Sequence, residues 1–374
     1  MRFIFSMLFL FFTTALIGQS STSYLLVGTY TKPKNKGEGI YVYRFNSNDG
    51  SAKLISKIET ENPSYLTVSK NKKYVYAVNQ NGNIKTNEAS AFALDNMGNL
   101  TFINKQKVNG ESPCYITVDK KNNWIFTANY TSGNISSLPI NKDGSLSEVK
   151  QLIQHAGSSI VKDRQSIAHA HTVVLTPNNK FLVATDLGTD KIKFYSFSSK
   201  QKQNPLTIDS TNDIICEAGS GPRHLAFSKN KRMMYAINEL NGTITVYKYR
   251  NATTQLLQKI STDTSNALDK GSADIHLSND EKFLYASNRG SYNNIAIYSI
   301  DDLGKLKFIA LQSTLGKTPR NFVIDPTDNF LLVANQNSDN IIVFKRNKET
   351  GLLQETGVEI KVGTPVCLQM IEVE

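Results

Sequence analysis

The chain has 374 residues, of which 42 are lysine or arginine and 32 are aspartate or glutamate, so its formal net charge is +10. The lysines are spread through polar turns along the whole chain, which indicates a solvated basic surface and argues against a nucleic-acid interface. Aromatic and β-branched residues alternate with Asn, Gly, Ser and Asp. This pattern argues against a helical fold and predicts many short strands joined by tight turns.

The first segment, residues 1–20, has the layout of a secretory signal peptide. A positive charge at Arg2 precedes an apolar run over residues 3–17, and small residues follow. The run is short for a spanning helix and polar sequence follows at once, so we expect cleavage instead of a retained membrane anchor. The expected location is the periplasm or the exterior of the cell. A cytoplasmic protein is the alternative if residues 1–20 are not a signal.

A two-strand unit recurs through residues 21–374. Each copy opens with proline or a small residue, passes through an apolar strand, a polar turn and a second apolar strand, and closes on Asn or Asp 16 positions later. The complete copies are residues 63–79, 113–129, 170–186, 222–238, 272–288 and 319–335. Two further short strands follow each copy before the next begins about 50 residues on, a period typical of a four-stranded propeller blade.

A seventh copy is divided between the two ends of the chain. Residues 364–371 match the first strand of the unit, and residues 24–30 match its second strand. Pairing of these segments would close a ring and leave no exposed sheet edge. We therefore predict an all-β fold, a seven-bladed β-propeller with one blade closed by the N- and C-terminal strands. An open β-solenoid is the alternative, but it gives no reason to divide one repeat.

Two columns of the repeat vary from blade to blade. After the proline position stand Ser64, Cys114, His171, Arg223, Ala273, Arg320 and Val366, and after the Asn or Asp position stand Gln80, Tyr130, Leu187, Glu239, Arg289, Gln336 and Tyr30. A hairpin centred near Lys231 would set Arg223 opposite Glu239, so both columns should meet at one rim of the central channel. The recurring Asn and Asp residues themselves are expected to bind turns and strand ends.

Charged and titratable members of these columns gather in four consecutive blades. We interpret His171, Arg223, Glu239, Arg289 and Arg320 as a site, because a purely structural repeat has no reason to concentrate them. Arginines are bidentate donors for anionic or carbonyl-rich ligands, while glutamate and histidine can act as base and acid. A salt-bridge network between blades is the structural alternative.

Two further histidines, His224 and His276, are candidates for substrate binding. By strand alternation they point away from the face of Arg223, which favours a structural or supporting role. The histidines lack a carboxylate or cysteine partner at ligand spacing, so no metal is predicted. Three scattered cysteines, Cys114, Cys216 and Cys367, form no disulfide framework and are expected to be mostly buried thiols.

Several of these runs resemble the propeller lactonase family, which includes bacterial 6-phosphogluconolactonases of the propeller type and the fungal carboxymuconate lactonizing enzyme. The matching runs are residues 186–190, 221–224, 238–240, 275–276, 288–290 and 319–322. They agree with the family in order, and the likeness extends over nearly the whole mature chain. The resemblance implies a lactone-handling site at one mouth of the channel, without metal or organic cofactor.

By motif match, the resemblance carries the catalytic assignment to His171, Arg223, Glu239 and Arg289, with Arg320 in a further matched run. In a hydrolase, Glu239 would be the general base that activates water, with His171 as the alternative base or as the acid for the leaving hydroxyl. Arg223 and Arg289 would stabilise the oxyanion or bind a carboxylate or phosphate. The expected partner is a small, anionic lactone, and the protein is expected to be a monomer without nucleic-acid contact, or membrane contact after cleavage.

The expected export is a departure from part of the family. The phosphogluconolactonases act on a cytosolic phosphorylated sugar, so an exported enzyme favours another sugar lactone, with 6-phosphogluconolactone as the reference substrate. Two other functions stay open at this point: a carboxymuconate-type cycloisomerase, and a non-catalytic propeller that binds a protein or a glycan.

Overall fold

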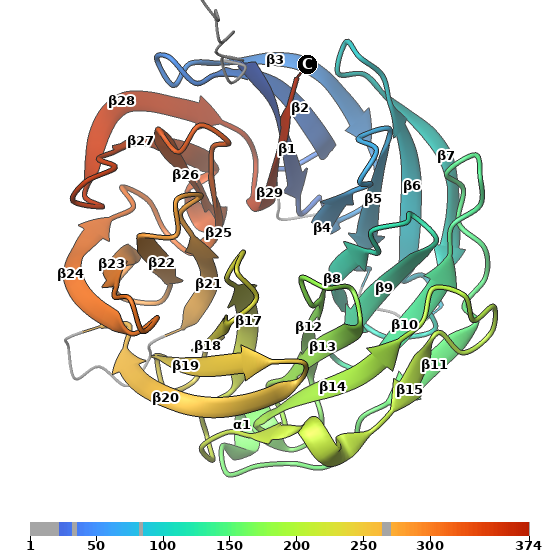
Figure 1. Cartoon of the computed structure of the whole chain (residues 1–374). Helices are drawn as coiled ribbons and strands as arrows, with labels where there is room; N and C mark the ends of the chain where they lie inside the picture. Colours follow the sequence, from blue (N-terminus) through green and yellow to red (C-terminus); the bar gives the residue numbers. More distant parts are fainter. Residues whose placement is uncertain (1–21, 32–35, 82–84, 264–270, 374) are drawn as a thin grey trace, which may run out of the picture.

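The computed structural model describes residues 22–31, 36–81, 85–263 and 271–373 (Figure 1). The signal peptide predicted over residues 1–20 lies outside the described residues. Within these ranges, no helix has the length and apolar character needed to cross a membrane.

Seven antiparallel sheets surround a central axis, and we number them as blades 1 to 7 (Figure 1). Blade 1 consists, from the inner strand outward, of β4 (Pro63–Val68), β5 (Tyr74–Asn79), β6 (Glu88–Leu94) and β7 (Leu100–Lys107). Blade 2 consists of β8 (Pro113–Val118), β9 (Trp124–Asn129), β10 (Asn134–Pro139) and β11 (Gln151–Gln154). Blade 3 consists of β12 (Ala170–Leu175), β13 (Phe181–Asp186), β14 (Lys191–Phe197) and β15 (Leu206–Ile208), with β16 (Ile214–Ile215) also paired to β14. Blade 4 consists of β17 (Pro222–Phe227), β18 (Met233–Asn238), β19 (Thr243–Arg250) and β20 (Thr253–Ser261). Blade 5 consists of β21 (Ser272–Leu277), β22 (Phe283–Asn288), β23 (Asn294–Ile300) and β24 (Leu306–Ser313). Blade 6 consists of β25 (Pro319–Ile324), β26 (Phe330–Asn335), β27 (Asn340–Arg346) and β28 (Leu353–Lys361).

Blade 7 combines the two ends of the chain, in the order β29 (Pro365–Glu372), β1 (Thr22–Thr29), β2 (Gly39–Asn46) and β3 (Ala52–Glu59). In Figure 1 the red strand β29 runs beside the blue strand β1. The two pair antiparallel from Ser23 with Glu372 to Gly28 with Cys367. The predicted seven-bladed propeller and its closure by both terminal strands are therefore confirmed.

The burial pattern follows from the position of each strand in its blade. Second strands such as β9 and β18 are buried along their whole length, because neighbouring blades cover both of their faces. They are therefore almost continuously apolar. Outermost strands such as β3 and β7 alternate between partly buried and exposed residues, because only one face meets another blade.

The polar positions that recur in the repeat bind neighbouring segments, as predicted. The side-chain amides of Asn288 and Asn335 donate to the backbone oxygens of Thr262 (2.9 Å) and Thr314 (3.0 Å), at the point where the outer strand returns to the next blade. These hydrogen bonds fix the ends of the second strands β22 and β26, and the variable residues Arg289 and Gln336 follow directly.

Every inner hairpin contains a β-bulge directly after the proline position. In blade 4, Pro222 pairs with Asn238 and His224 pairs with Ile237, which leaves Arg223 unpaired between them. The predicted pairing of Arg223 with Glu239 is thus wrong in register. The pairs nearer the turn, such as His224 with Ile237, would continue to Arg223 with Asn238, and the bulge instead gives Asn238 to Pro222 and leaves Arg223 without a partner. Glu239 follows the end of β18, and its N–H donates to the oxygen of Gly221 at 2.7 Å. The two columns still meet at the rim.

Closure of the ring can be tested at Leu368, which is 2% exposed and pairs with Val27 across the β29–β1 seam. Leu368→Ala should cost about 2–5 kcal/mol, because it leaves a cavity in that seam. The measurement is urea unfolding followed by fluorescence of the single tryptophan, Trp124, which lies in blade 2. Leu352→Ala, at a residue 44% exposed, is the control and should change stability by less than about 0.5 kcal/mol. Equal midpoints for the two variants would contradict the closure.

Candidate functional site

Four bulge residues, one each from blades 2, 3, 4 and 6, line one cavity of about 350 Å³. They are Cys114, His171, Arg223 and Arg320. The cavity is lined by Tyr30, Gln80, Cys114, Tyr130, Arg164, His171, Arg223, Glu239, Arg289 and Arg320. The structure therefore brings together all five members of the predicted column site. It adds aromatic and amide side chains from the same two columns.

Glu239 lies at the centre of an arginine cluster. Its Oε1 atom is 2.6 Å from Nη2 of Arg164, and its Oε2 atom is 2.8 Å from Nε of Arg223 and 2.9 Å from Nη2 of Arg289. Burial raises the pKa of the Glu239 carboxyl, but the positive charges of the three arginines outweigh burial and hold that pKa well below its ordinary value. Glu239 is therefore ionised, and both of its oxygens are engaged.

Charge in the cavity is strongly unbalanced. Four arginines line it, and Glu239 is the single acidic side chain among the described residues that line it. Arg320 pairs with no acid in the described part of the chain, and its guanidinium carbon lies 5.6 Å from the centre of the Tyr30 ring. The Tyr30 hydroxyl donates to Oε1 of Gln80 at 2.8 Å, which fixes that ring. Arg320 is thus held in place with its donors available to an anion.

His171 is the histidine of the site, and its ring is uncharged at neutral pH. Burial, followed by the charge of Arg223, lowers the pKa of the His171 ring well below its ordinary value. Its Nδ1 atom is buried and has no hydrogen-bond partner among the described residues. The ring packs edge-on against Tyr130, with centroids 5.7 Å apart. At neutral pH the site therefore holds a neutral imidazole beside the arginines.

Arg164 is a site residue that the sequence did not single out. It lies on α1 (Lys162–Gln165), in the loop that precedes β12, and is thus outside the repeat columns. Its Nη2 atom also lies 3.3 Å from the Tyr130 hydroxyl. The sequence feature that could have indicated Arg164 is the charged run over residues 162–164, which lies in the widest interval between copies of the repeat.

The structure places His224 and His276 outside this cavity. Both bind Asp274, and they line a second cavity of about 330 Å³ toward the hairpin-turn end of β17 and β21. Arg223 lies between His224 and Glu239, with Nη1 3.2 Å from Nε2 of His224. The two histidines therefore do not join the predicted site directly, in agreement with their alternation along the strands.

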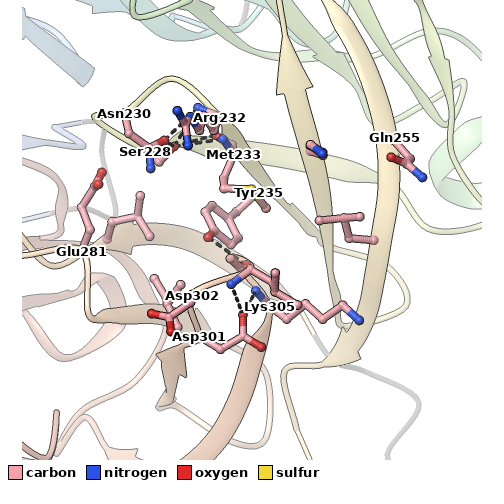
Figure 2. Close-up of a pocket in the computed structure, with 16 residues that line it drawn as sticks. Ser228, Asn230, Arg232, Met233, Tyr235, Gln255, Glu281, Asp301, Asp302 and Lys305 are labelled. Atoms are coloured by element: carbon pink, nitrogen blue, oxygen red, sulfur yellow. Dashed lines mark hydrogen bonds between the residues drawn. The ribbon is translucent and has the colours of Figure 1, made fainter.

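A larger cavity, about 660 Å³, lies between blades 4 and 5 (Figure 2). Here the Tyr235 hydroxyl donates to the oxygen of Gly304 at 3.0 Å, across the blade boundary. The same contact links Tyr76 to Gly144 (3.1 Å) and Tyr285 to Gly351 (2.8 Å) at other blade boundaries. Because the contact repeats around the ring, we assign this groove to blade packing and not to chemistry.

The cysteines are not arranged for redox or metal chemistry. All three are free, with Cys114 and Cys367 buried and Cys216 partly buried. Burial raises the pKa of the Cys114 thiol to about 12, so it lines the cavity as a neutral thiol. No group of three or more His, Cys, Asp or Glu side chains in the described ranges could hold a metal ion.

Known proteins are similar to this chain over nearly its whole length. A family model described as "Lactonase, 7-bladed beta-propeller" matches residues 24–370. A 6-phosphogluconolactonase of Formosa agariphila is 38% identical over 350 residues, which are 92% of this chain and 99% of that protein. A 6-phosphogluconolactonase of Bacillus subtilis is 34% identical over 354 residues, which are 92% of this chain and 97% of that protein.

Solved structures are similar in the same way. A putative 6-phosphogluconolactonase from Bacteroides fragilis has a TM-score of 0.90 at 40% identity and covers 94% of this chain and 98% of its own. A periplasmic gluconolactonase of Pseudomonas aeruginosa has a TM-score of 0.90 at 35% identity and covers 95% of this chain and 100% of its own.

The role of Glu239 as the shared anion of the cluster predicts a pH-dependent loss of stability in Glu239→Gln. At pH 7 the variant should lose about 3–5 kcal/mol of unfolding free energy, because three guanidiniums lose their buried counter-ion. The folded-state pKa of Glu239 is lowered, so its contribution is complete above the unfolded value of about 4.3 and is lost as pH falls below it. The difference from wild type should therefore shrink in urea unfolding at about pH 3.

The matched control for this experiment is Glu355→Gln, which removes an exposed carboxylate on β28. It should change stability by less than about 0.5 kcal/mol at either pH. An equal loss in Glu239→Gln at both pH values, or no loss at pH 7, would contradict the electrostatic role.

Proposed function

Because the chain belongs to the lactonase family of seven-bladed β-propellers, we propose that it hydrolyses a sugar lactone in the cavity around Arg223, Arg289 and Glu239. The observation that carries this proposal is the arrangement of three guanidiniums around one carboxylate, with a fourth guanidinium and a neutral imidazole in the same cavity. Lactone opening by water needs an oxyanion to be stabilised and a proton to be moved, and these are the groups that can do both.

Arg223 and Arg289 are proposed to stabilise the oxyanion. Water adds to the lactone carbonyl and gives one proton to the base, the ring C–O bond then breaks and the leaving oxygen takes up a proton, and the resulting hydroxy acid releases its carboxyl proton to solvent. Negative charge develops on the carbonyl oxygen during the addition, where fixed guanidinium donors in a buried cavity are most effective. Glu239 holds both donors through Oε2, so they need no reorganisation when the charge forms.

We propose His171, rather than Glu239, as the general base. The sequence favoured Glu239, but its three ion pairs and its lowered pKa make it a weak proton acceptor at neutral pH. His171 lines the same cavity and is neutral, so one of its ring nitrogens carries a free lone pair. A proton on His171 is disfavoured beside the arginines until the oxyanion forms, which couples proton uptake to water attack. The same ring can then return the proton to the leaving ring oxygen.

The substrate is proposed to be a sugar lactone, with 6-phosphogluconolactone and gluconolactone as the two reference compounds. The Formosa relative is named a 6-phosphogluconolactonase, which supports the first compound. The Pseudomonas relative is named a gluconolactonase, which supports the second. The excess positive charge of the cavity favours a phosphate or carboxylate on the substrate, and the signal-like residues 1–20 support an exported enzyme that meets unphosphorylated sugars. In either case the arginines would face the carboxylate of the product.

A variant His171→Asn should lower kcat for lactone hydrolysis by about 10²- to 10⁴-fold, the usual contribution of a general base. Because the pKa of His171 is lowered, wild-type kcat/KM should not decline as pH falls from 7 through 6.5, where an ordinary histidine becomes protonated. Rates are measured by titrating released acid and subtracting hydrolysis in buffer. Full activity in the variant at an unchanged melting temperature would remove His171 from the mechanism.

Arg320→Gln tests recognition of a phosphate by the one unpaired arginine of the cavity. For 6-phosphogluconolactone we expect kcat/KM to drop by about 10- to 100-fold, since a hydrogen bond to a charged group is lost. For gluconolactone we expect a smaller change. Lys317→Gln removes an exposed cation from the loop that leads to β25 and serves as the control for net charge. Equal losses on both lactones would place the phosphate, if it is bound, elsewhere.

A further inference from the structure

A buried polar group lies beneath Arg223, on the side away from Glu239. Its centre is Asp274, which is 2% exposed. Oδ1 of Asp274 accepts a hydrogen bond from Nδ1 of His224 at 2.7 Å, while Oδ2 accepts from Nδ2 of Asn321 at 2.5 Å and from Nε2 of His276 at 3.0 Å. The proposed chemistry uses none of these side chains.

The charge states in this group fix the orientation of the His224 ring. Burial raises the pKa of Asp274, but His276 and the hydrogen bond from His224 hold it well below its ordinary value, so Asp274 is ionised. Burial, and then the charge of Arg223, lower the pKa of His224 to about 4, so this ring is neutral at pH 7. A neutral ring that donates from Nδ1 to Asp274 keeps a lone pair on Nε2.

That lone pair is directed at Arg223. Nη1 of Arg223 lies 3.2 Å from Nε2 of His224 and also donates to the backbone oxygen of Ala273. On its other edge, Nε of Arg223 pairs with Oε2 of Glu239 at 2.8 Å. The remaining nitrogen, Nη2, makes no hydrogen bond to a described residue and is the donor left for a substrate.

Blade 5 supplies this support through its own bulge. Its inner hairpin pairs Ser272 with Asn288 and next pairs Ile275 with Ala286, so both Ala273 and Asp274 are unpaired. Ala273 places its carbonyl oxygen on Arg223, and Asp274 binds His224. This explains why the variable column carries a small residue in blade 5 between two arginines, Arg223 and Arg320. The blade contributes to the site through a backbone oxygen and a supporting carboxylate.

We propose that His224 and Asp274 are positioning residues for Arg223, an inference that rests on the proposed hydrolase function. Asp274 selects the tautomer of His224, and Nε2 of His224 then holds Nη1 of Arg223 so that Nη2 faces the reacting carbonyl. The aromatic edges of Tyr115 and Tyr65, with ring centroids 5.3 and 6.0 Å from that of His224, keep the imidazole in this orientation.

Two substitutions at His224 separate its two hydrogen bonds. In His224→Gln the side chain is long enough to offer an oxygen to Arg223, in the place of Nε2. In His224→Asn the amide can still donate to Asp274, in the place of Nδ1, but no longer reaches Arg223. We expect His224→Asn to lower kcat by about 10- to 100-fold with KM little changed, since an oxyanion donor is misplaced. His224→Gln should keep most of the activity.

A purely structural role for His224 would give a different result. It would lower the melting temperature of both variants and reduce kcat in both to the same extent, and that outcome would overturn the proposal. Unchanged kcat in His224→Asn would overturn it as well. Asp274→Asn is a second test and should behave like His224→Asn, because an amide no longer imposes one tautomer on the ring.

Binding of 6-phosphogluconate, measured by calorimetry, separates this inference from the proposed function. If wild-type protein opens no lactone but binds this anion, the hydrolase proposal fails and the positioning of Arg223 is tested by affinity alone. His224→Asn should then bind at least about 10-fold more weakly than His224→Gln. Equal affinity of the two variants would reject the positioning role.

Discussion

Three guanidinium groups share the carboxylate of Glu239, and the rest of the site depends on that shared charge. Without it, the positive charges of Arg164, Arg223 and Arg289 would repel one another at close range. With it, their donors are fixed around one open space, and the surplus charge remains available for a ligand. In the proposed mechanism this stabilisation of the anion makes Glu239 a weak base. Proton transfer therefore passes to the neutral His171 in the proposed mechanism.

A β-bulge in every inner hairpin makes this concentration of charge possible. Regular pairing would give each residue of an inner strand a fixed partner on the second strand, whereas the bulge leaves one residue free to point into the channel rim. Arg223 occupies the bulge of blade 4, and His171 occupies the bulge of blade 3. The repeat thus provides seven equivalent positions without loss of the hairpins, and substitution there changes the chemistry while the propeller stays intact.

The sequence predicted the fold more completely than the site. The bounds of the repeated unit, such as residues 63–79, coincide with the ends of the two inner strands, because apolar strands and polar turns are local signals. The two variable columns also contain the five predicted residues that meet in the cavity. Arg164 is absent from them because its loop lies outside the repeat, and the bulge depends on pairing between strands, which no local pattern indicates. The low pKa of Glu239 follows from three arginines distant in sequence, so no local pattern indicated it.

The most direct test of the proposed site is a crystal structure of the protein soaked with 6-phosphogluconate, the product of the reference reaction. We predict density in the cavity at the channel rim, with the carboxylate on Arg223 and Arg289 and His171 beside it. Density in the groove between blades 4 and 5, or an empty rim cavity at a saturating concentration of the anion, would contradict it.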